Sequence, residues 1–402
     1  MKSHPANGPR AATDVLVADV HALGMLGVVR SLGRGGYRTH GYSADPGALG
    51  LQSRYNRHPA VAPRYDDAAF LPWLRDYVQR HRIRALVPTE GCLLALRPVF
   101  AEFAHLLPLA PGPEVVYRCL SKFDVLDVFL REPPDSALRK HLPSTALLRP
   151  SDLPVLSERV AGLEPPVWVK GDAVHDGLGR DAVVRRCDTH TEAAQVAATL
   201  LERYDAVLAQ GNASSPVQAG ANVLIDDGEV VAASMMLSLH DSPHTGGTSG
   251  LRRSWWHDAM HADAVARLRH LGWQGVAMVE YKWDPRSDAF EFIEVNSRFW
   301  AGLHLDLASG VDYPRLLIDR ALGIERAGLA RGRTGVVTRW TLPTDLGHTL
   351  SRMRDPGLPL WNRAVAPVEF AWNCLAPGVR DDLRYPGDAA LYWRQWRNFL
   401  RT

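Results

Sequence analysis

Two apolar segments late in the chain, residues 275–283 and 290–295, most constrain how this sequence can fold. A short polar turn separates them, so they are expected to form an antiparallel hairpin. Glu280 lies on the first predicted strand, and Glu294 and Asn296 lie at the end of the second. Residues two apart in a strand share a face, so Glu294 and Asn296 point the same way. Closure of the hairpin then brings Glu280 nearly opposite Glu294.

Two carboxylates and an amide oxygen gathered between apolar strands favour a bound cation, because the carboxylates repel each other. Mg²⁺ prefers such oxygen ligands and keeps its other positions for water or phosphate. The spacing is equally compatible with a solvated strand face on which Lys282 supplies the opposite charge. Arg298 follows with the same parity and suits phosphate oxygens or a developing oxyanion, with an ordinary surface arginine as the alternative.

The first part of the chain alternates short apolar strands with helical stretches. Its predicted elements are strands at 14–18, 37–42 and 85–88 and helices at 28–32 and 70–81. This alternation predicts a parallel α/β sheet with right-handed crossovers. Gly24 and Gly27 follow the first strand, but the three-glycine dinucleotide fingerprint is missing. We therefore expect a structural turn there, with a nicotinamide or flavin site as the alternative.

The middle of the chain predicts further strands and helices. The predicted elements are helices at 121–131, 189–204 and 258–271 and strands at 167–170, 181–186, 206–210, 222–225 and 230–236. Residues 226–229, Asp-Asp-Gly-Glu, are a strong hairpin signal, because Asp-Gly accepts positive φ in the turn. A proline-rich connection is expected at 133–154. The glycine-rich segment 241–254 is expected to be a loop, either a functional flap or a disordered one.

Bulk composition excludes several classes of protein. A formal net charge of +2 over 402 residues gives no overall field for nucleic acid or a membrane surface. The four cysteines form no CxxC pair, so neither a zinc site nor a disulfide framework is expected. No apolar run approaches the length of a transmembrane helix. Residues 1–13 are predicted to be a disordered tail, and the composition suits a cytoplasmic protein.

Residues 273–284 and 292–300 resemble the metal-binding hairpin of ATP-grasp carboxylate–amine ligases. Residues 244–249 and 302–314 also resemble one subgroup, the predicted ATP-dependent carboligase-like proteins. The resemblance implies an α/β protein whose ATP-grasp fold, two α+β subdomains gripping ATP, follows a Rossmann-like parallel-sheet domain. The implied division is a tail at 1–13, a Rossmann-like domain at 14–118, small and large ATP-grasp subdomains at 119–205 and 206–330, and an extension at 331–402.

The resemblance also implies roles for individual residues. Glu280, Glu294 and Asn296 would hold one or two Mg²⁺ ions, or Mn²⁺ in their place, against the β- and γ-phosphates of ATP. Lys122 and Lys170 match the two lysines that approach the nucleotide from either side.

Other implied positions complete the nucleotide site. Residues 171–179 would form the loop that closes over the phosphates, and Gln210 lies where the hinge meets adenine. The hinge, residues 208–216, lacks the usual acidic residues for ribose, and Asn222 is the proposed substitute. Ser121 stands where an aspartate commonly precedes the first lysine.

The remaining expected site residues concern the reaction and its substrates. Arg298 matches the arginine beside the transferring phosphoryl group and the reacting carboxylate. Arg252 is a second candidate for stabilising the oxyanion, and Arg253 a candidate for holding the substrate carboxylate. Gly247 belongs to the predicted flap. Glu90, at the end of a strand of the first domain, is a candidate for reading an amine, with a structural turn as the alternative.

The expected function is therefore ATP- and Mg²⁺-dependent joining of a carboxylate to an amine, with an amino acid or small peptide as substrate. The expected partners are these small molecules, without nucleic acid or a transmembrane segment, and a homo-oligomer is left open. One alternative is a non-catalytic ATP-binding regulator on the same fold, and another is a dehydrogenase, which rests on the first-domain glycines alone. The Trp- and Arg-rich end, residues 392–401, is expected to fold back on its own domain, with a membrane surface or a partner as the alternative.

Overall fold

The structure is a computed structural model that describes residues 9–172, 174, 183–212, 215–325 and 328–401. The N-terminal part contains a four-stranded parallel sheet in the order β3-β2-β1-β4. Its elements are β1 (Asp14–Val17), α1 (Leu23–Arg34), β2 (Arg38–Ser43), β3 (Ala60–Val61), α2 (Phe70–His81) and β4 (Ala85–Val87). The predicted parallel α/β sheet is confirmed, and α2 has the predicted bounds.

Two expectations for this region are wrong. Residues 9–12, assigned to a disordered tail, form a short helix, because Arg10 pairs with Asp319 at 2.7 Å. Gly24 and Gly27 lie inside α1 and not in a turn. A Cβ at Gly24 would come within 2.3 Å of the carbonyl oxygen of Trp300, so this glycine permits close helix packing.

Helices follow β4 and lead into a second, antiparallel sheet of four strands in the order β5-β8-β6-β7. The helices are α3 (Glu90–Leu96), α4 (Phe100–Phe103), α5 (Pro113–Leu120) and α6 (Lys122–Leu130). The sheet and its helices are β5 (Thr145–Leu148), α7 (Leu156–Val160), β6 (Val167–Gly171), β7 (Val183–Cys187), α8 (His190–Leu201) and β8 (Val207–Gln210). β5 lies in the segment expected to be a proline-rich connection. Its four residues, flanked by prolines, carry too little periodicity to be recognised.

The largest sheet has eight strands, and seven of them follow the order β13-β12-β9-β10-β11-β15-β16. They are β9 (Val217–Asp226), β10 (Glu229–Ser242), β11 (Thr248–Trp255), β12 (Gly275–Trp283), β13 (Phe290–Asn296), β15 (Val337–Arg339) and β16 (Val379–Asp381), and β14 (Ala330–Arg331) pairs with β10. The two predicted hairpins are confirmed, and Asp227 and Gly228 have φ of 52° and 75° in the first.

Residues 241–254, which were predicted to form a loop, are mostly strand. β10 extends to Ser242 and β11 begins at Thr248, so a turn of five residues, 243–247, connects them. Small polar residues can pair across strands when their side chains satisfy one another, and here the hydroxyl of Ser238 donates to that of Ser249 at 2.7 Å.

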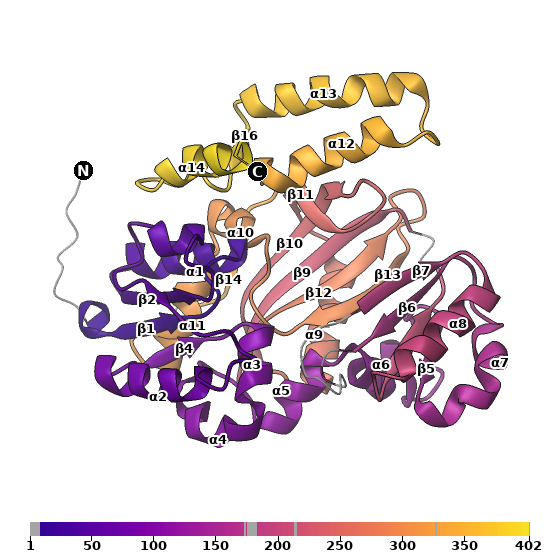
Figure 1. The fold of residues 1–402 in the computed structure, drawn as a ribbon, viewed down its shortest axis with the longest axis horizontal. Coiled ribbons are helices and arrows are strands. Elements are labelled where there is room, and N and C mark those ends of the chain that lie inside the picture. Colours follow the sequence, from indigo (N-terminus) through magenta and orange to yellow (C-terminus); the bar gives the residue numbers. More distant parts are fainter. Residues whose placement is uncertain (1–8, 173, 175–182, 213–214, 326–327, 402) are drawn as a thin grey trace.

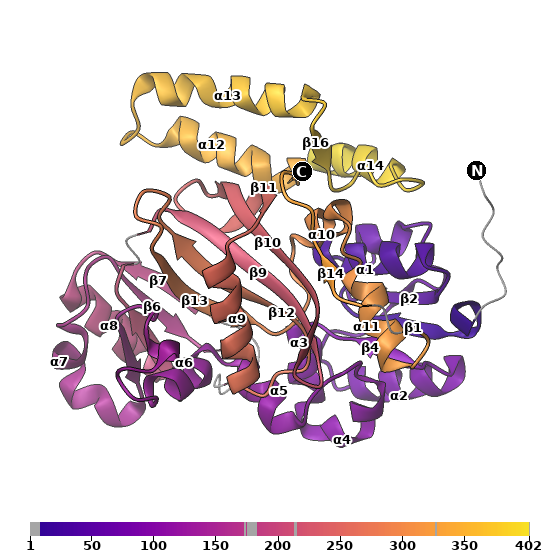
Figure 2. The same ribbon diagram turned by 180° about the vertical axis from the view of Figure 1, so that it is seen from behind.

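Helices and the N-terminal sheet cover the two faces of the large sheet. Helix α9 (Asp258–His270) crosses one face, where Met260, Ala264 and Leu268 are buried (Figure 2). Helices α10 (Leu303–Ser309) and α11 (Tyr313–Ala321) pack between the other face and the N-terminal sheet, while the β5–β8 sheet lies at the opposite side of the molecule (Figure 1).

The last part of the chain contains helices and the two short strands β15 and β16. Helices α12 (Leu346–Arg354) and α13 (Leu360–Leu375) lie antiparallel above the sheet, and α14 (Ala390–Phe399) lies beside them (Figure 1). Because β15 and β16 extend the large sheet, this segment shares a sheet with residues 217–296. The division of the chain into the five segments named above stays a prediction.

Candidate functional site

Two glutamates face each other across the β12–β13 hairpin. Glu280 of β12 is the register partner of Glu294 of β13, as the strand parity predicts, and both side chains are partly buried. Burial, together with the charge of Glu294, raises the pKa of Glu280 to about 7. Burial alone would also raise the pKa of Glu294, but Lys122 and Lys170 overcome it and lower that pKa to about 2.

Two side-chain amides complete the pair. Asn296 Nδ2 donates to Glu280 Oε1 at 3.0 Å and to Glu294 Oε1 at 3.1 Å, so the amide bridges the two carboxylates. Gln218 Nε2, from β9, donates to Glu280 Oε2 at 3.1 Å. Gln218 is not among the predicted site residues, because β9 begins before the predicted strand at 222–225. This longer strand pairs Gln218 with Lys282 of β12.

Lys122 and Lys170 approach the same glutamate from different elements. Lys122, the first residue of α6, places its Nζ 2.6 Å from Glu294 Oε2, and the Glu294 charge raises the pKa of this lysine. Lys170 of β6 donates to Gln210 Oε1 of β8 at 2.5 Å, and burial lowers its pKa to about 8. Helix α6, the β5–β8 sheet and the β12–β13 hairpin of the large sheet therefore bring two lysines and two glutamates together.

A buried aspartate that the sequence reading missed holds Lys122 in place. Asp172 Oδ2 accepts hydrogen bonds from Ser121 Oγ at 3.1 Å and from the backbone N–H of Phe123 at 3.0 Å. Ser121 in turn caps α6 by accepting from the N–H of Asp124. A carboxylate at a helix N-terminus is stabilised by the free N–H groups there. The sequence does hold a signal for Asp172. It lies two residues after Lys170, so in extended chain the two side chains point the same way.

Arg298 and Glu90 lie next to each other. Arg298 Nε donates to Glu90 Oε2 at 3.3 Å, and both side chains are about one-third exposed, 31% and 34%. Glu90 begins α3 directly after β4, where Thr89 caps the helix. The pair therefore joins the end of β13 to the N-terminal sheet and leaves both charged groups open to a ligand.

The structure gives Asn222 a structural role, which corrects its proposed contact with ribose. The side chain is completely buried, and Nδ2 donates to Asp306 Oδ1 at 3.0 Å. Trp300 Nε1 donates to the other oxygen of Asp306 at 2.7 Å. Asn222 therefore fastens α10 to the sheet, and it has no exposed surface with which to contact a nucleotide.

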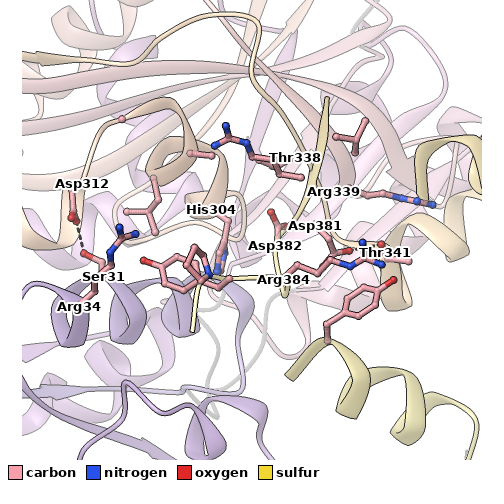
Figure 3. A pocket seen from close by; sticks show the side chains of 18 of the residues that line it. Ser31, Arg34, His304, Asp312, Thr338, Arg339, Thr341, Asp381, Asp382 and Arg384 are labelled. Carbon is pink, nitrogen blue, oxygen red and sulfur yellow. Dashed lines mark hydrogen bonds between the residues drawn. The ribbon is translucent and has the colours of Figure 1, made fainter. Parts of the chain in front are cut away.

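Arg252 is likewise not a catalytic residue in this structure. Its side chain is 1% exposed and forms an ion pair with Asp382, which is fully buried. By register it shares a sheet face with Glu280 but lies on β11, three strands away from β12. Asp382 also lines a separate cavity of about 790 Å³ between α1, α10 and the β15–β16 region, shown in Figure 3, and no residue of the Glu280 group lines it.

Arg253 and Gly247 also lie apart from the glutamates. Arg253 pairs with Leu237 and points to the sheet face that carries α9, so it cannot hold a substrate on the Glu280 face. Gly247 has a φ of 143°, and a Cβ there would lie 2.4 Å from the carbonyl oxygen of Ser242. This glycine is therefore required by the β10–β11 turn, and its assignment to substrate binding loses its basis.

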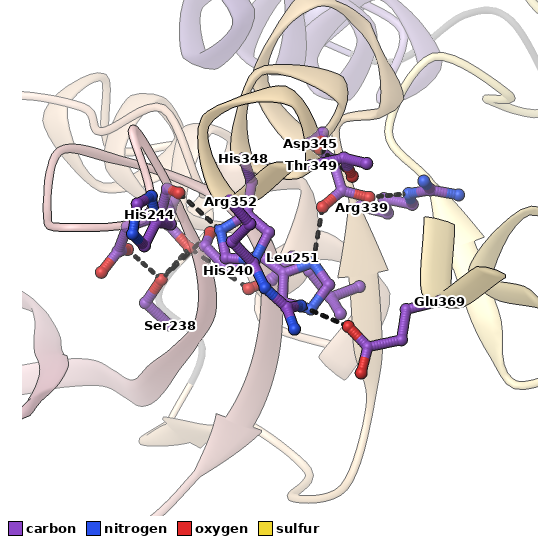
Figure 4. Close-up of polar contacts among 12 residues, drawn as sticks. Ser238, His240, His244, Leu251, Arg339, Asp345, His348, Thr349, Arg352 and Glu369 are labelled. Carbon is purple, nitrogen blue, oxygen red and sulfur yellow. Dashed lines mark hydrogen bonds and ion pairs between the residues drawn. The ribbon is translucent and has the colours of Figure 1, made fainter. Parts of the chain in front are cut away.

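The β10–β11 turn is fastened to α12 by histidines, as Figure 4 shows. His240 Nδ1 lies 2.6 Å from Asp345 Oδ1, and Asp345 also accepts from Arg339. The rings of His240 and His348 stack with centroids 4.1 Å apart. His244 Nε2 contacts Asp355 Oδ2 at 2.9 Å. The turn is thus packed against the C-terminal helices and does not hang free as a flap.

Several predicted positions fall where the structure cannot test them. The loop expected over the phosphates, 171–179, includes residues 173 and 175–179, and the hinge 208–216 includes residues 213 and 214, all outside the described residues. Among the residues that the structure describes, no group of three or more His, Cys, Asp and Glu side chains forms a metal cluster. The group around Glu280 has two carboxylates and one amide, so it contains only two side chains of these four types.

Comparison with known proteins gives the class of fold. The family described as carbamoyl-phosphate synthase L chain, ATP binding domain, matches residues 249–312, a segment that includes Glu280, Glu294, Asn296 and Arg298. No curated protein sequence is matched by the whole chain or part of it.

Solved structures resemble about four-fifths of this chain at low sequence identity. Biotin carboxylase from Campylobacter jejuni is 16% identical, with a TM-score of 0.59 over 79% of this chain and 72% of that one. N5-carboxyaminoimidazole synthetase from Staphylococcus aureus is 11% identical, with a TM-score of 0.60 over 80% of each chain. L-amino acid ligase from Bacillus licheniformis is 15% identical, with a TM-score of 0.53 over 77% of this chain and 74% of that one. The protein has the ATP-grasp fold, as the sequence resemblance predicted.

Proposed function

We propose that this protein is an ATP- and Mg²⁺-dependent ligase that activates a substrate carboxylate and joins it to an amine. The observation that carries the proposal is the Glu280–Glu294 pair, bridged by Asn296 and approached by Lys122 and Lys170 from two other elements. The solved structures that resemble this one include an amino acid ligase and a carboxylase bound to MgADP and bicarbonate.

The glutamate pair suits a divalent cation. Burial, and then the facing charge of Glu294, raise the pKa of Glu280 to about 7, and a cation between the two carboxylates would offset both effects. Two carboxylates and one amide oxygen leave ligand positions for water and phosphate, as Mg²⁺ prefers. Glu280, Glu294 and Asn296 would hold the ion, and bound Mg²⁺ would offset negative charge on the phosphate oxygens of ATP.

The remaining residues would bind and orient the reactants. Lys122 and Lys170 supply positive charge for the phosphates, and Gln210 fixes the position of Lys170. A carboxylate oxygen attacks the γ-phosphorus and ADP leaves. The ammonium group loses a proton to a base or to water, the neutral amine attacks the carbon of the acyl phosphate, phosphate leaves, and the second proton from nitrogen is released as the amide forms. In this proposal Arg298 would hold the substrate carboxylate and stabilise the oxyanion, and Glu90, which accepts a hydrogen bond from it, would receive the ammonium group of the amine substrate.

An amino acid or small peptide is the substrate class that this arrangement supports. Arg298 and Glu90 present opposite charges 3.3 Å apart at the junction of the sheet and the N-terminal part, which suits molecules that carry both a carboxylate and an ammonium group. ADP release with pools of amino acids and dipeptides tests this. ADP formation that depends on the substrate would support the assignment. Glu90→Gln should then raise the KM for that substrate more than it lowers kcat.

The decisive experiment measures ADP and phosphate formation by the wild type and by Glu294→Gln. We expect turnover to fall at least about 100-fold in the variant, because the charge that pairs with Lys122 and the cation is lost. Glu229→Gln is the matched control, since Glu229 lies at the start of β10 with its side chain 83% exposed. ATP binding without any ADP release in the presence of acids and amines would instead favour the non-catalytic ATP-binding regulator.

A further inference from the structure

The outward side of α13 is apolar along its whole length. Every exposed residue of this helix is non-polar, and large side chains among them are 64–80% exposed. These residues, called here the α13 outer face, are Leu360, Trp361, Ala364, Pro367, Val368, Ala371, Trp372 and Leu375. A surface helix ordinarily turns polar residues outward, so this arrangement is inverted.

Polar contacts hold the inward side of α13 against α12. Arg352 of α12 pairs with Glu369 and also donates to the backbone carbonyl of Asn362 at 3.2 Å. Figures 1 and 2 show α13 as the outermost element, with no described segment lying over it. The apolar face is therefore a presented surface, and its large exposed side chains lie together on one side of one helix and are not scattered singly.

The most exposed charged residues of the C-terminal helical segment are arginines. In residues 346–401 the exposed charged residues are Arg354, Arg380, Arg384, Arg397 and Arg401. Each acidic residue of the same segment accepts a hydrogen bond within the protein: Asp355 from His244, Glu369 from Arg352, Asp381 from Thr341, Asp382 from Arg252 and Asp388 from Arg30. Glu369 keeps 43% of its side chain exposed, and its charge is paired with Arg352. The small net charge of the whole chain conceals this local positive surface.

Helix α14 adds to both properties. Trp393 is 67% exposed and Leu400 is 78% exposed, and Arg397 lies between them in sequence. Leu391 and Tyr392 on the other side of α14 are buried against α1 residues, so the helix is fixed to the body of the protein. The predicted folding back of this segment is thus correct, yet its outward side still carries Trp and Arg.

We propose that the α13 outer face and the arginines around it dock on the surface of an anionic lipid bilayer. Tryptophan and leucine on one side of a helix suit the boundary between head groups and acyl chains, and arginine attracts anionic head groups. A second copy of the chain is the weaker occupant, because a two-fold contact would bring like arginine rims together. Within the described residues, no helix is both long and apolar enough to cross a membrane, so the contact would be peripheral.

The test is flotation of the full-length protein with phosphatidylcholine vesicles, with and without phosphatidylglycerol. We expect binding to the anionic vesicles that weakens as salt is added. Trp361→Ser together with Trp372→Ser should weaken binding at least about tenfold, because two interfacial anchors are removed. Leu329→Ser is the matched control, since Leu329 is 67% exposed and lies outside the C-terminal helices.

A second set of variants tests the charge. Arg354→Gln, Arg397→Gln and Arg401→Gln combined should lower binding to anionic vesicles by about fivefold for each arginine and leave binding to neutral vesicles unchanged. Thermal unfolding establishes that all variants are folded. Equal flotation of the wild type and the double tryptophan variant would overturn the proposal. So would a dimer, present without lipid, that the double tryptophan variant dissociates.

Discussion

Two groups of charged residues on the same face of the large sheet differ in how their charges are arranged. Around Glu280 and Glu294, like charges face each other, and the nearest ion pair, Lys122–Glu294, has side chains 33% and 15% exposed. At Arg252 and Asp382, opposite charges meet one to one, with side chains 1% and 0% exposed. The first arrangement sets like charges against each other and suits a bound cation, whereas the second pairs opposite charges within the protein and suits packing. Burial still raises the pKa of Asp382 to about 7, so the pair carries a desolvation cost of its own.

Arg252→Met should give the largest effect on stability. The buried carboxyl of Asp382 loses its partner, and breaking a buried pair in this way costs about 3–5 kcal/mol of unfolding free energy. Asp382 must then stay protonated, so the loss grows as pH rises above the unfolded value of its pKa. Chemical denaturation at two pH values measures this. Arg252→Met combined with Asp382→Leu should recover most of the loss, and failure to recover would show that the pair does not act as a unit.

Glu280→Gln should reduce activity without reducing stability. We expect ADP formation to fall about 100-fold, because a ligand for the cation is lost, while the unfolding free energy stays unchanged or rises by about 1 kcal/mol as the repulsion with Glu294 is relieved. Turnover and denaturation are measured on the same preparation. A variant that keeps its activity, or that loses stability like Arg252→Met, would remove the distinction between the two groups.

The contact between α12 and the β10–β11 turn should be sensitive to acid, because it includes His348. Burial, with the neighbouring charge of His240, lowers the pKa of His348 to about 4. The unfolded chain therefore binds the proton more readily, so stability should fall by about 2 kcal/mol as pH falls from about 6.5 toward 4. Nδ1 of His348 lies 2.7 Å from the carbonyl oxygen of Asp241. His348→Asn keeps a donor and should flatten this dependence in thermal scans, whereas an unchanged slope would assign it to other groups.

Asp172→Asn should give a smaller, local effect. The substitution weakens the bonds to Ser121 and to the N–H of Phe123, and we expect a loss of about 1–2 kcal/mol and a higher KM for ATP, because Lys122 begins the same helix. Urea denaturation and ATP titration of initial rates measure the two effects. Asp124→Asn, which changes another acidic residue in the first turn of α6, is the comparison variant. A KM that does not change would argue against positioning of Lys122 by Asp172.

Local patterns predicted much of the fold. The β12–β13 hairpin and helices α2 and α9 follow from alternation, helical spacing and a polar turn, so their predicted bounds lie close to the observed ones. β5 and the strand ends at 241–254 were missed, because short or polar strands depend on their neighbours more than on their own sequence. The facing of Glu280 and Glu294 followed from parity within one hairpin.

The sequence alone determined the residues that a single hairpin or helix brings together, because side-chain direction within one element is set by its own period. Tertiary structure decided the rest. Only the strand order shows that Arg252 lies three strands from Glu280 and that Arg253 points to the other face. Only the packing of α12 shows that the polar side of α13 is the covered one. Such choices depend on contacts between residues far apart in the chain, which no local pattern records.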